Sequence, residues 1–168
     1  MPLNLLVKYN KLLDITGMSE IQREKSLQGV FNRDIRNNPR FIFRDKKIHP
    51  TPEDGIDSLE RLFNHLTTRI INKNERKREF DLPRSVRLHW VKFHVEEQKK
   101  ENMLVFSVDE PNGIRTYIYD KDEEYVIILE PYRNRSAYYL LSAYYLEGKD
   151  KARNTMMKKY KRKLLETL

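Results

Sequence analysis

The stretch from Tyr117 to Tyr145 constrains the fold most strongly, because it is the most β-prone part of the chain. Val, Ile, Leu and Tyr dominate Tyr125–Leu129 and Tyr138–Tyr145, and such side chains suit a pleated, half-buried surface. The charged run Asp120–Glu124 between two such segments predicts a hairpin connection. Eight of the ten tyrosines lie in this stretch. We therefore expect a sheet with one packed face and one face that presents aromatic rings and hydroxyls.

Short connections join this stretch to a further β-prone segment before it. The predicted strands are 103–108, 114–119, 125–130 and 136–146, with a turn at Pro111-Asn112-Gly113. Short links between successive strands favour an antiparallel meander. In the last strand, Tyr138, Ser142 and Tyr144 share one parity, which predicts that they share one face.

Helical patterns precede this sheet. Apolar residues recur at helical spacing over residues 3–13, and Ser19 with Gln22 forms a capping box for a second helix, which Pro39 stops. Thr51 before Pro52 predicts the start of a third helix. Its apolar positions are Ile56, Leu59, Leu62, Phe63, Leu66 and Ile70.

A fourth helix and a basic C-terminal helix complete the predicted elements. Residues 73–78 are expected to be a charged connector, Asp81 to cap a helix that includes Trp90, and a lysine-rich helix to start near Lys151. Helices followed by strands indicate an α+β fold with a roughly four-stranded antiparallel sheet. We expect one domain over 1–168, with a helical N-terminal extension at 1–45 and a core at 46–168.

The amino-acid composition excludes several classes of site and function. The chain has no cysteine, which excludes a disulfide framework, a thiolate metal site and a cysteine nucleophile, and fits a reducing cytoplasm. No apolar run reaches the roughly 18 to 20 residues that span a bilayer. We therefore expect a cytoplasmic protein without a membrane partner.

The positive charge is unevenly distributed. The net charge is +8, and residues 69–101 hold ten Lys or Arg against six Asp or Glu, while residues 151–168 hold seven against one. The rest of the chain therefore carries a small negative charge. Two basic blocks predict a polyanion partner, namely nucleic acid. The alternative is a lysine-rich surface that only solvates the protein.

The available side chains suit RNA cleavage without a metal or cofactor. The chain lacks a Gly-rich phosphate loop and a nucleophile elbow, and its four histidines do not have metal-ligand spacing. Cleavage through the ribose 2′-hydroxyl needs only a base, an acid and cations that hold the phosphate. We therefore expect no cofactor and no metal.

Two histidines are candidates for proton transfer. His89 lies among Arg84, Arg87 and Lys92 on a predicted helix, and its ordinary pKa lies near neutrality. The alternative is a core histidine beside Trp90 that bonds to the backbone. His65 lies within an apolar helical pattern, which favours a core role.

The predicted strands supply further candidates. Arg115, Tyr117 and Tyr119 alternate with aliphatic residues, so one face is cationic and aromatic and suits phosphate contact with base stacking. Ser142 is a small hydroxyl among bulky neighbours, which leaves room for a ligand or merely packs well. Glu130 ends the most hydrophobic strand, where it is a candidate base or simply a solvated carboxylate.

Several of these segments, in order, resemble the phage-associated nucleases of the Barnase–EndoU–colicin–RelE-like superfamily. The segments that carry the resemblance are Arg87–Lys92, Arg115–Tyr119, Tyr125–Glu130 and Tyr138–Tyr144, within a match over roughly His49 to Tyr160. The resemblance implies helices before an antiparallel sheet and a metal-independent ribonuclease, often deployed as a toxin by a phage or prophage. By position, His65, the Arg87/His89 block, Tyr117 or Arg115, and Ser142-Ala143-Tyr144 would line the cleft. Relatives carry Thr-Ala-Tyr at that triplet, so Ser142 keeps the hydroxyl.

The leading hypothesis is therefore a ribonuclease that acts in the bacterial host cytoplasm. His89 would act as acid or base, with Glu130 or His65 as its counterpart, while Arg87, Arg115 and Lys92 hold phosphate. The partners would be RNA, with transfer RNA among the candidates, and an immunity or antitoxin protein. The alternative is a catalytically inactive phage protein of the same fold that binds nucleic acid or a protein partner.

Overall fold

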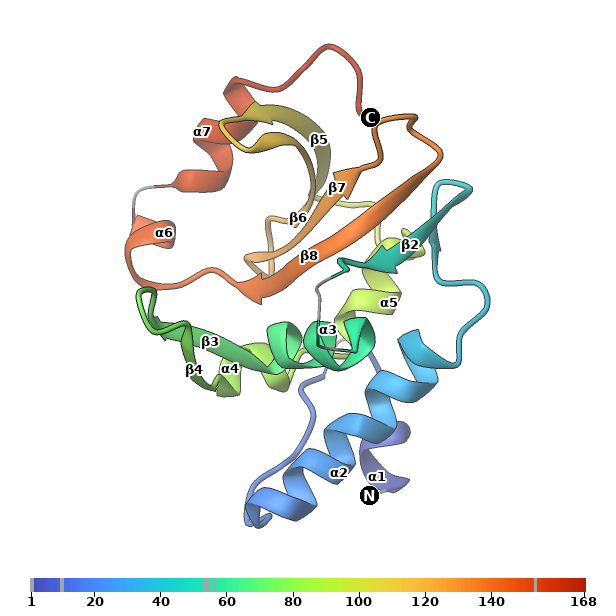
Figure 1. Ribbon diagram of the computed structural model, residues 1–168, viewed down its shortest axis with the longest axis vertical. Coiled ribbons are helices and arrows are strands. Elements are labelled where there is room, and N and C mark those ends of the chain that lie inside the picture. Colours follow the sequence, from blue (N-terminus) through green and yellow to red (C-terminus); the bar gives the residue numbers. More distant parts are fainter. Residues whose placement is uncertain (1, 10, 53–54, 56, 153) are drawn as a thin grey trace.

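A computed structural model describes residues 2–9, 11–52, 55, 57–152 and 154–168. The fold is α+β, with a curled six-stranded mixed sheet above a layer of helices (Figure 1). The strand order is β1-β2-β8-β7-β6-β5, and a separate hairpin joins β3 to β4. The expected α+β class is confirmed.

The four predicted strands exist, but the sheet is larger than expected. They are β5 (Met103–Glu110), β6 (Gly113–Asp120), β7 (Tyr125–Pro131) and β8 (Ala137–Tyr145), and they pair as an antiparallel meander. The expectation of a four-stranded, purely antiparallel sheet is wrong. β1 (Ile42–Phe43) and β2 (Lys46–Pro50) extend the sheet, and β2 runs parallel to β8.

One face of the sheet packs on the helices and forms the main core. Because side chains alternate along a strand, Tyr125, Ile127 and Leu129 of β7 all point to this face and are almost fully buried. They join one apolar cluster with residues from the helices, which include Leu27, Val30, Phe31, Leu62, Leu66, Trp90 and Val91. The first forty residues therefore contribute directly to the same core as the sheet.

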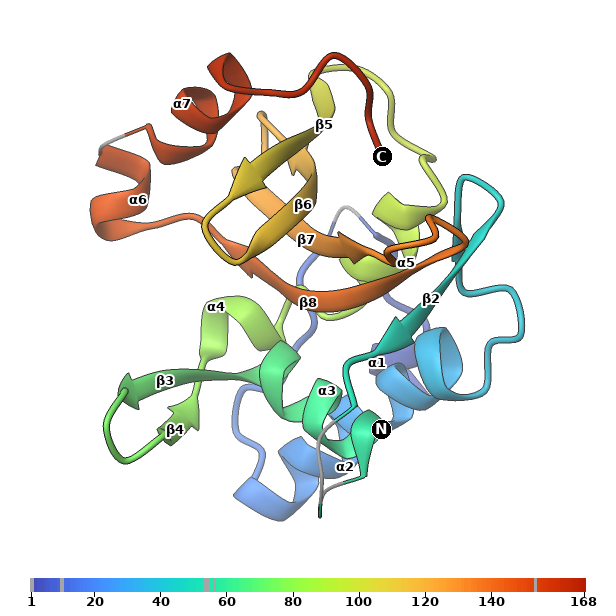
Figure 2. The ribbon, with the colours of Figure 1, turned by 45° about the horizontal axis from the view of Figure 1, so that its top comes forward.

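The other face of the sheet is covered over one half. α7 (Thr155–Lys161) follows α6 (Gly148–Ala152) and lies across β5 and β6 (Figure 2). The ring of Tyr160 meets Phe106 edge-on at 5.2 Å, and Met156 is buried in the same cluster as Tyr117. The C-terminal helix thus closes the β5–β6 half, while the face over β7, β8 and β2 retains partly exposed side chains.

The N-terminal segment is less helical than its pattern predicts. α1 (Pro2–Leu5) ends far short of Leu13, because the Asn4 side chain binds the backbone of Asp14 and the Leu13 amide donates to Val86. Tertiary bonds therefore override the local helical spacing over residues 6–9 and 11–13. α2 (Glu20–Phe31) begins with the predicted capping box, and the π-helical turn η1 (Asn32–Arg36) ends before Pro39 as expected.

The middle of the chain departs from the predicted helices at both ends. Ile56 lies outside the described residues, and α3 (Ser58–Thr67) is capped by Asp57 rather than Thr51. Ile70 and the expected connector instead form a hairpin, and Asp81 caps only a short helix, so two brief helices replace one long one. These elements are β3 (Thr68–Asn72), β4 (Lys77–Phe80), α4 (Leu82–Ser85) and α5 (Trp90–Val95).

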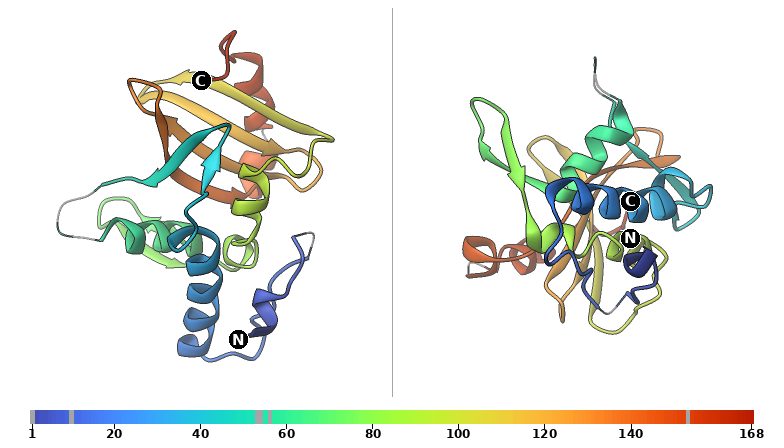
Figure 3. Two further views of the ribbon diagram at one scale, coloured as in Figure 1. Left: turned by 90° about the vertical axis from the view of Figure 1, so that its right-hand side faces the viewer. Right: turned by 90° about the horizontal axis from the view of Figure 1, so that it is seen from below.

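The two chain ends lie at opposite ends of the molecule, and the hairpin β3–β4 projects from its side (Figures 1 and 3). None of the described helices has the length and apolar character needed to cross a membrane.

A buried ionic network joins α5 to the sheet. Asp120, which is 1% exposed, accepts hydrogen bonds from His94 Nε2 at 2.9 Å and Lys99 Nζ at 2.6 Å. Burial alone would raise the pKa of Asp120, but these two donors and the Glu123 amide outweigh burial and lower it. The network therefore stabilises the fold only while Asp120 carries its charge.

We expect Asp120→Asn to lower the free energy of unfolding by about 3 to 5 kcal/mol, because Lys99 loses its buried counter-charge and His94 loses a charged hydrogen-bond acceptor. Urea unfolding at pH 7 measures this. The matched control is Asp122→Asn, which removes the more exposed acceptor of Lys99 and should cost about 0 to 1 kcal/mol. Because the folded-state pKa of Asp120 lies below its unfolded value, the difference between wild type and Asp120→Asn should shrink as pH falls through the acid range. Equal losses in the two variants at pH 7 would contradict this account.

Candidate active site

The candidate site lies along the edge of β8, beyond the point where β2 ends. β2 pairs with β8 only from Ala137 to Leu140. Within the described chain, the rest of β8 has β7 on one side and α3 and α4, rather than a strand, on the other. A strand edge has unpaired backbone groups, so side chains from the two helices meet it there.

His65 on α3 reaches this edge. Its ring hydrogen-bonds the backbone of Leu141, and the side chain is partly exposed. When a neutral imidazole donates its N–H to a carbonyl, its second ring nitrogen is unprotonated and can accept a proton. Burial, followed by repulsion from Arg78, Arg61 and Arg84, lowers the pKa of His65 to about 4. His65 is therefore neutral near pH 7 and can accept a proton.

Arg84 is the central cation of the site. Asp81 caps α4 by accepting from the Arg84 amide, and both Asp81 N and Ser85 Oγ donate to Thr67 O, which fixes α4 against the end of α3. The guanidinium then donates to His65 O at 2.7 Å and to Ser142 Oγ at 3.4 Å. It also lies over the Tyr144 ring, 5.2 Å from its centre. The local fold thus gathers Arg84, His65, Ser142 and Tyr144.

Two further arginines complete the positive cluster. Arg61 lies one turn before His65 on α3 and binds the Thr51 hydroxyl, while Arg78 of β4 binds the Thr68 hydroxyl at 2.8 Å and its carbonyl at 2.9 Å. Burial lowers the pKa of both Arg78 and Arg84. The sequence patterns did not single out Arg61 and Arg78, although Arg61 lies four residues before His65 and therefore on the same helical face.

Ser142 and Tyr144 face the open side of the sheet, together with Glu130 and Arg115. A β-bulge interrupts the β7–β8 register, so that Ser142 pairs with Ile128 whereas Leu140 already pairs with Leu129. Arg115 Nη1 lies 3.6 Å from Glu130 Oε1 on the same face. These two candidates therefore form an ion pair near the site, rather than presenting a separate base and a separate phosphate ligand.

Because of the bulge, side chains along β8 do not alternate between the two faces as the sequence predicted. Tyr138 was expected to share a face with Ser142 and Tyr144, but it points into the core, where its ring meets Phe43. The extra residue in the bulge reverses the alternation. Tyr139, opposite Glu130, takes the open face instead.

His89 does not line this site. It is 5% exposed, and its Nε2 lies 2.7 Å from Lys11 O and 3.2 Å from Lys8 O. It precedes α5, which packs on the opposite face of the sheet from Arg115 through the contact of Trp90 with Tyr125. Burial lowers the pKa of His89. The alternative of a core histidine bonded to backbone therefore describes its position.

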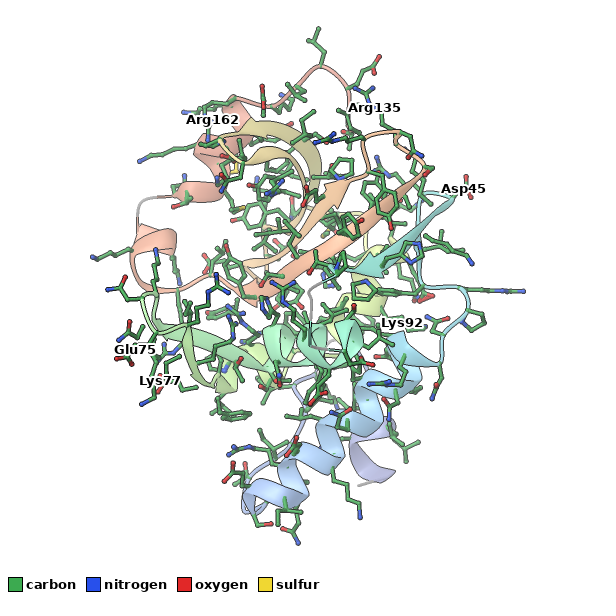
Figure 4. The ribbon with its side chains drawn as sticks, viewed as in Figure 1. Asp45, Glu75, Lys77, Lys92, Arg135 and Arg162 are labelled. Atoms are coloured by element: carbon green, nitrogen blue, oxygen red, sulfur yellow. The ribbon has the colours of Figure 1, made fainter. Side chains whose placement is uncertain are left out.

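Four other candidates do not contact His65, Arg84 or Ser142 directly. Lys92, labelled in Figure 4, pairs with Glu96 at 2.9 Å and borders a hollow with His89. Arg87 lies over the Tyr145 ring and donates to Pro83 O. Tyr117 and Tyr119 are 3% and 7% exposed beneath the C-terminal segment. Burial and the bond to Glu110 raise the pKa of Tyr117.

A hollow borders part of the site, and its lining combines two arginines with two carboxylates. This hollow of about 240 Å³ lies next to Arg84 and Tyr144, and its remaining lining residues are Arg69, Asp81, Tyr145 and Glu147. Across the described residues, no three His, Asp or Glu side chains lie close enough to hold a metal ion. The chemistry on offer is a neutral imidazole, guanidinium groups and hydroxyls.

Comparison with known proteins adds no family. No protein-family model, no curated protein and no solved structure matches this chain. The resemblance to phage-associated nucleases therefore stays an expectation.

We expect His65 to titrate near pH 4 in an NMR titration of the histidine ring signals, with His65→Gln used to assign its resonance. Arg78→Gln should raise this midpoint, because it removes one of the cations that oppose protonation. The matched control is Arg36→Gln, which removes an exposed arginine that binds Asn32 and should leave the midpoint unchanged. A His65 midpoint at its ordinary value, near 6.5, would contradict the electrostatic description of the site.

Proposed function

We propose that this protein is a ribonuclease that cleaves RNA through the ribose 2′-hydroxyl without a metal ion. The observation that carries the proposal is the convergence of a neutral, partly exposed His65 with three arginines, Ser142 and Tyr144 at the edge of β8. RNA supplies its own nucleophile, so the protein needs to move protons and stabilise charge. The residues at this edge can do both.

In the proposed reaction, His65 accepts the proton of the 2′-hydroxyl. The 2′-oxygen then bonds to phosphorus while the bond from phosphorus to the 5′-oxygen breaks. The products are a 2′,3′-cyclic phosphate and a 5′-hydroxyl. The low pKa of His65 keeps it deprotonated at neutral pH, so almost all molecules start with the base in its competent form.

Arg84, supported by Arg61 and Arg78, would stabilise the negative charge on the phosphate oxygens. Arginine suits this role because its planar fork binds phosphate through two parallel hydrogen bonds. The bond to Ser142 Oγ and the stacking on Tyr144 hold the guanidinium in place. Arg115, although paired with Glu130, lies on the same face and would contact a neighbouring phosphate.

The leaving 5′-oxygen needs a proton, and we assign its delivery to the hydroxyl of Tyr144. Tyr144 lies on the open face beside Ser142 and is packed against the guanidinium of Arg84. A cation over the ring stabilises the phenolate that forms when the proton leaves. The base, His65, then comes from α3 and the acid, Tyr144, comes from β8, and the phosphate would lie between them.

The resemblance to phage-associated nucleases adds a biological setting to the proposal. On that reading the enzyme is a phage or prophage toxin that acts in the bacterial host cytoplasm. Transfer RNA is one candidate for its RNA substrate, and an immunity or antitoxin protein would block its site. The positive edge of β8 would be the surface for such an inhibitor.

In an RNA cleavage assay with EDTA, we expect His65→Gln to lower the rate by about 10²- to 10⁴-fold, the usual contribution of a general base. Arg84→Gln should lower it by about 10²- to 10³-fold, as for loss of one charge-stabilising donor. The control is Lys92→Gln, which removes a cation on the other side of the sheet and should retain full activity. Cleavage that is unchanged in His65→Gln would contradict the mechanism. Tight RNA binding without cleavage by the wild type would favour the nucleic-acid-binding alternative.

We expect Tyr144→Phe to lower the cleavage rate of ordinary RNA, because the leaving oxygen loses its proton donor. An RNA with a bridging 5′-sulfur separates this role from a structural one, since a thiolate leaves without protonation. The ratio of Tyr144→Phe to wild-type rates should return towards one with the sulfur substrate, whereas His65→Gln should stay impaired. A similar deficit of Tyr144→Phe on both substrates would contradict the assignment of Tyr144 as the acid.

A further inference from the structure

A second group of partly exposed side chains lies on the same open face, one step along β8 from the candidate site. The Tyr132 and Tyr139 rings lie 4.5 Å apart and are hydrogen-bonded to each other. The His49 ring lies 5.9 Å from that of Tyr132. We refer to His49, Tyr132 and Tyr139 as the aromatic cluster. The mechanism above uses none of these residues.

The sheet register fixes the cluster beside the site. His49 of β2 pairs with Tyr139 of β8, and Tyr139 pairs with Glu130 of β7. Arg115, Glu130, Tyr139 and His49 thus form one row across four strands, and the next row holds Ile128 and Ser142. At about 3.3 Å per residue, Tyr139 lies within roughly 10 Å of Ser142 along β8.

Three exposed cations flank the cluster along the chain. Lys47 lies two residues before His49 on the same face of β2, and Arg133 and Arg135 lie in the exposed turn between β7 and β8, where Figure 4 labels Arg135. Among the described residues, none of these three has an ion-pair partner within 4.0 Å. Aromatic rings can stack on a nucleobase, and cations beside them can bind the phosphates on either side of that base.

We propose that the aromatic cluster binds one unstacked nucleobase of single-stranded RNA next to the cleaved bond. This inference rests on the proposed function, since it makes the cluster a subsite of the same substrate. Base stacking on Tyr139 and Tyr132 favours a single strand over a duplex, because a paired base presents no free ring face. Lys47, Arg133 and Arg135 hold the adjacent phosphates.

The test measures binding and stacking without cleavage. Single-stranded RNAs of eight nucleotides, each with 2-aminopurine at one position, are titrated into His65→Gln protein in EDTA. Stacking on a ring quenches 2-aminopurine, so one position, or two neighbouring ones, should show a strong loss of fluorescence on binding. Tyr139→Leu and Tyr132→Leu, each in the His65→Gln background, should abolish this loss and weaken binding about 5- to 100-fold, the range for one stacked base.

Two further variants control for structural effects. Tyr139→Phe keeps the ring and should retain the quenching, which separates loss of stacking from damage to β8. Tyr9→Leu removes another partly exposed tyrosine, which stacks on Phe93 away from this face, and should bind as the parent does. Circular dichroism and thermal melting confirm that each variant folds.

The outcomes separate the subsite from the catalytic proposal. Unchanged affinity and quenching in both leucine variants overturn the subsite, even where the wild type cleaves RNA in a His65-dependent way. Tyrosine-dependent quenching supports the subsite even where the wild type does not cleave RNA, which would overturn the ribonuclease alone. Failure of every RNA to bind overturns both.

Discussion

The short reach of β2 along β8 is the constraint on which the candidate site depends. β2 pairs in parallel with β8 as far as Leu140 and then leaves the sheet. A longer partner would have satisfied the remaining backbone groups of β8 and kept α3 and α4 away from it. Instead, His65 binds the Leu141 backbone and Arg84 binds the Ser142 side chain. The incomplete strand pairing therefore brings side chains with useful chemistry to a strand edge that still has hydrogen bonds to make.

The electrostatics of this edge favour an anion. Three arginines act on His65, and Asp81 is the one carboxylate near Arg84 for which the described residues show a direct charge contact. Burial lowers the pKa of Arg78 and Arg84, so keeping these two guanidinium groups charged costs energy, and a phosphate bound beside them would offset part of that cost. The same repulsion keeps His65 neutral. That repulsion also lowers the proton affinity of His65, and a phosphate bound between the arginines would offset it, so anion binding and proton acceptance at His65 are coupled.

The sequence predicted those features that depend on local pattern. Alternating Val, Ile and Tyr located β5 to β8, and the side chains of Ser19 and Asp81 cap helices as expected. β2 escaped prediction because a parallel strand pairs with a segment about ninety residues away, and its five residues carry no pattern of their own. For His89 the alternative of a core histidine describes the structure, because the carbonyls of Lys8 and Lys11, in a segment expected to be helical, bond to its ring. In each case a contact between distant segments overrode the local signal.

The open face of the sheet has one half covered by the C-terminal helix and one accessible half. Over β5 and β6, Tyr117 donates to Glu110, which also accepts a bond from Lys159 of α7 at 2.6 Å, so the C-terminal helix is fastened to that half. Over β8, the bulge at Leu141 turns Tyr139 and Ser142 to the same side, although their odd separation would place them on opposite faces of a regular strand. One inserted residue therefore puts Tyr139 of the aromatic cluster and Ser142 of the candidate site on the same face of the sheet. A tyrosine-rich sheet alone does not produce this arrangement, because four of the seven tyrosines in its strands, Tyr117, Tyr119, Tyr125 and Tyr138, are buried.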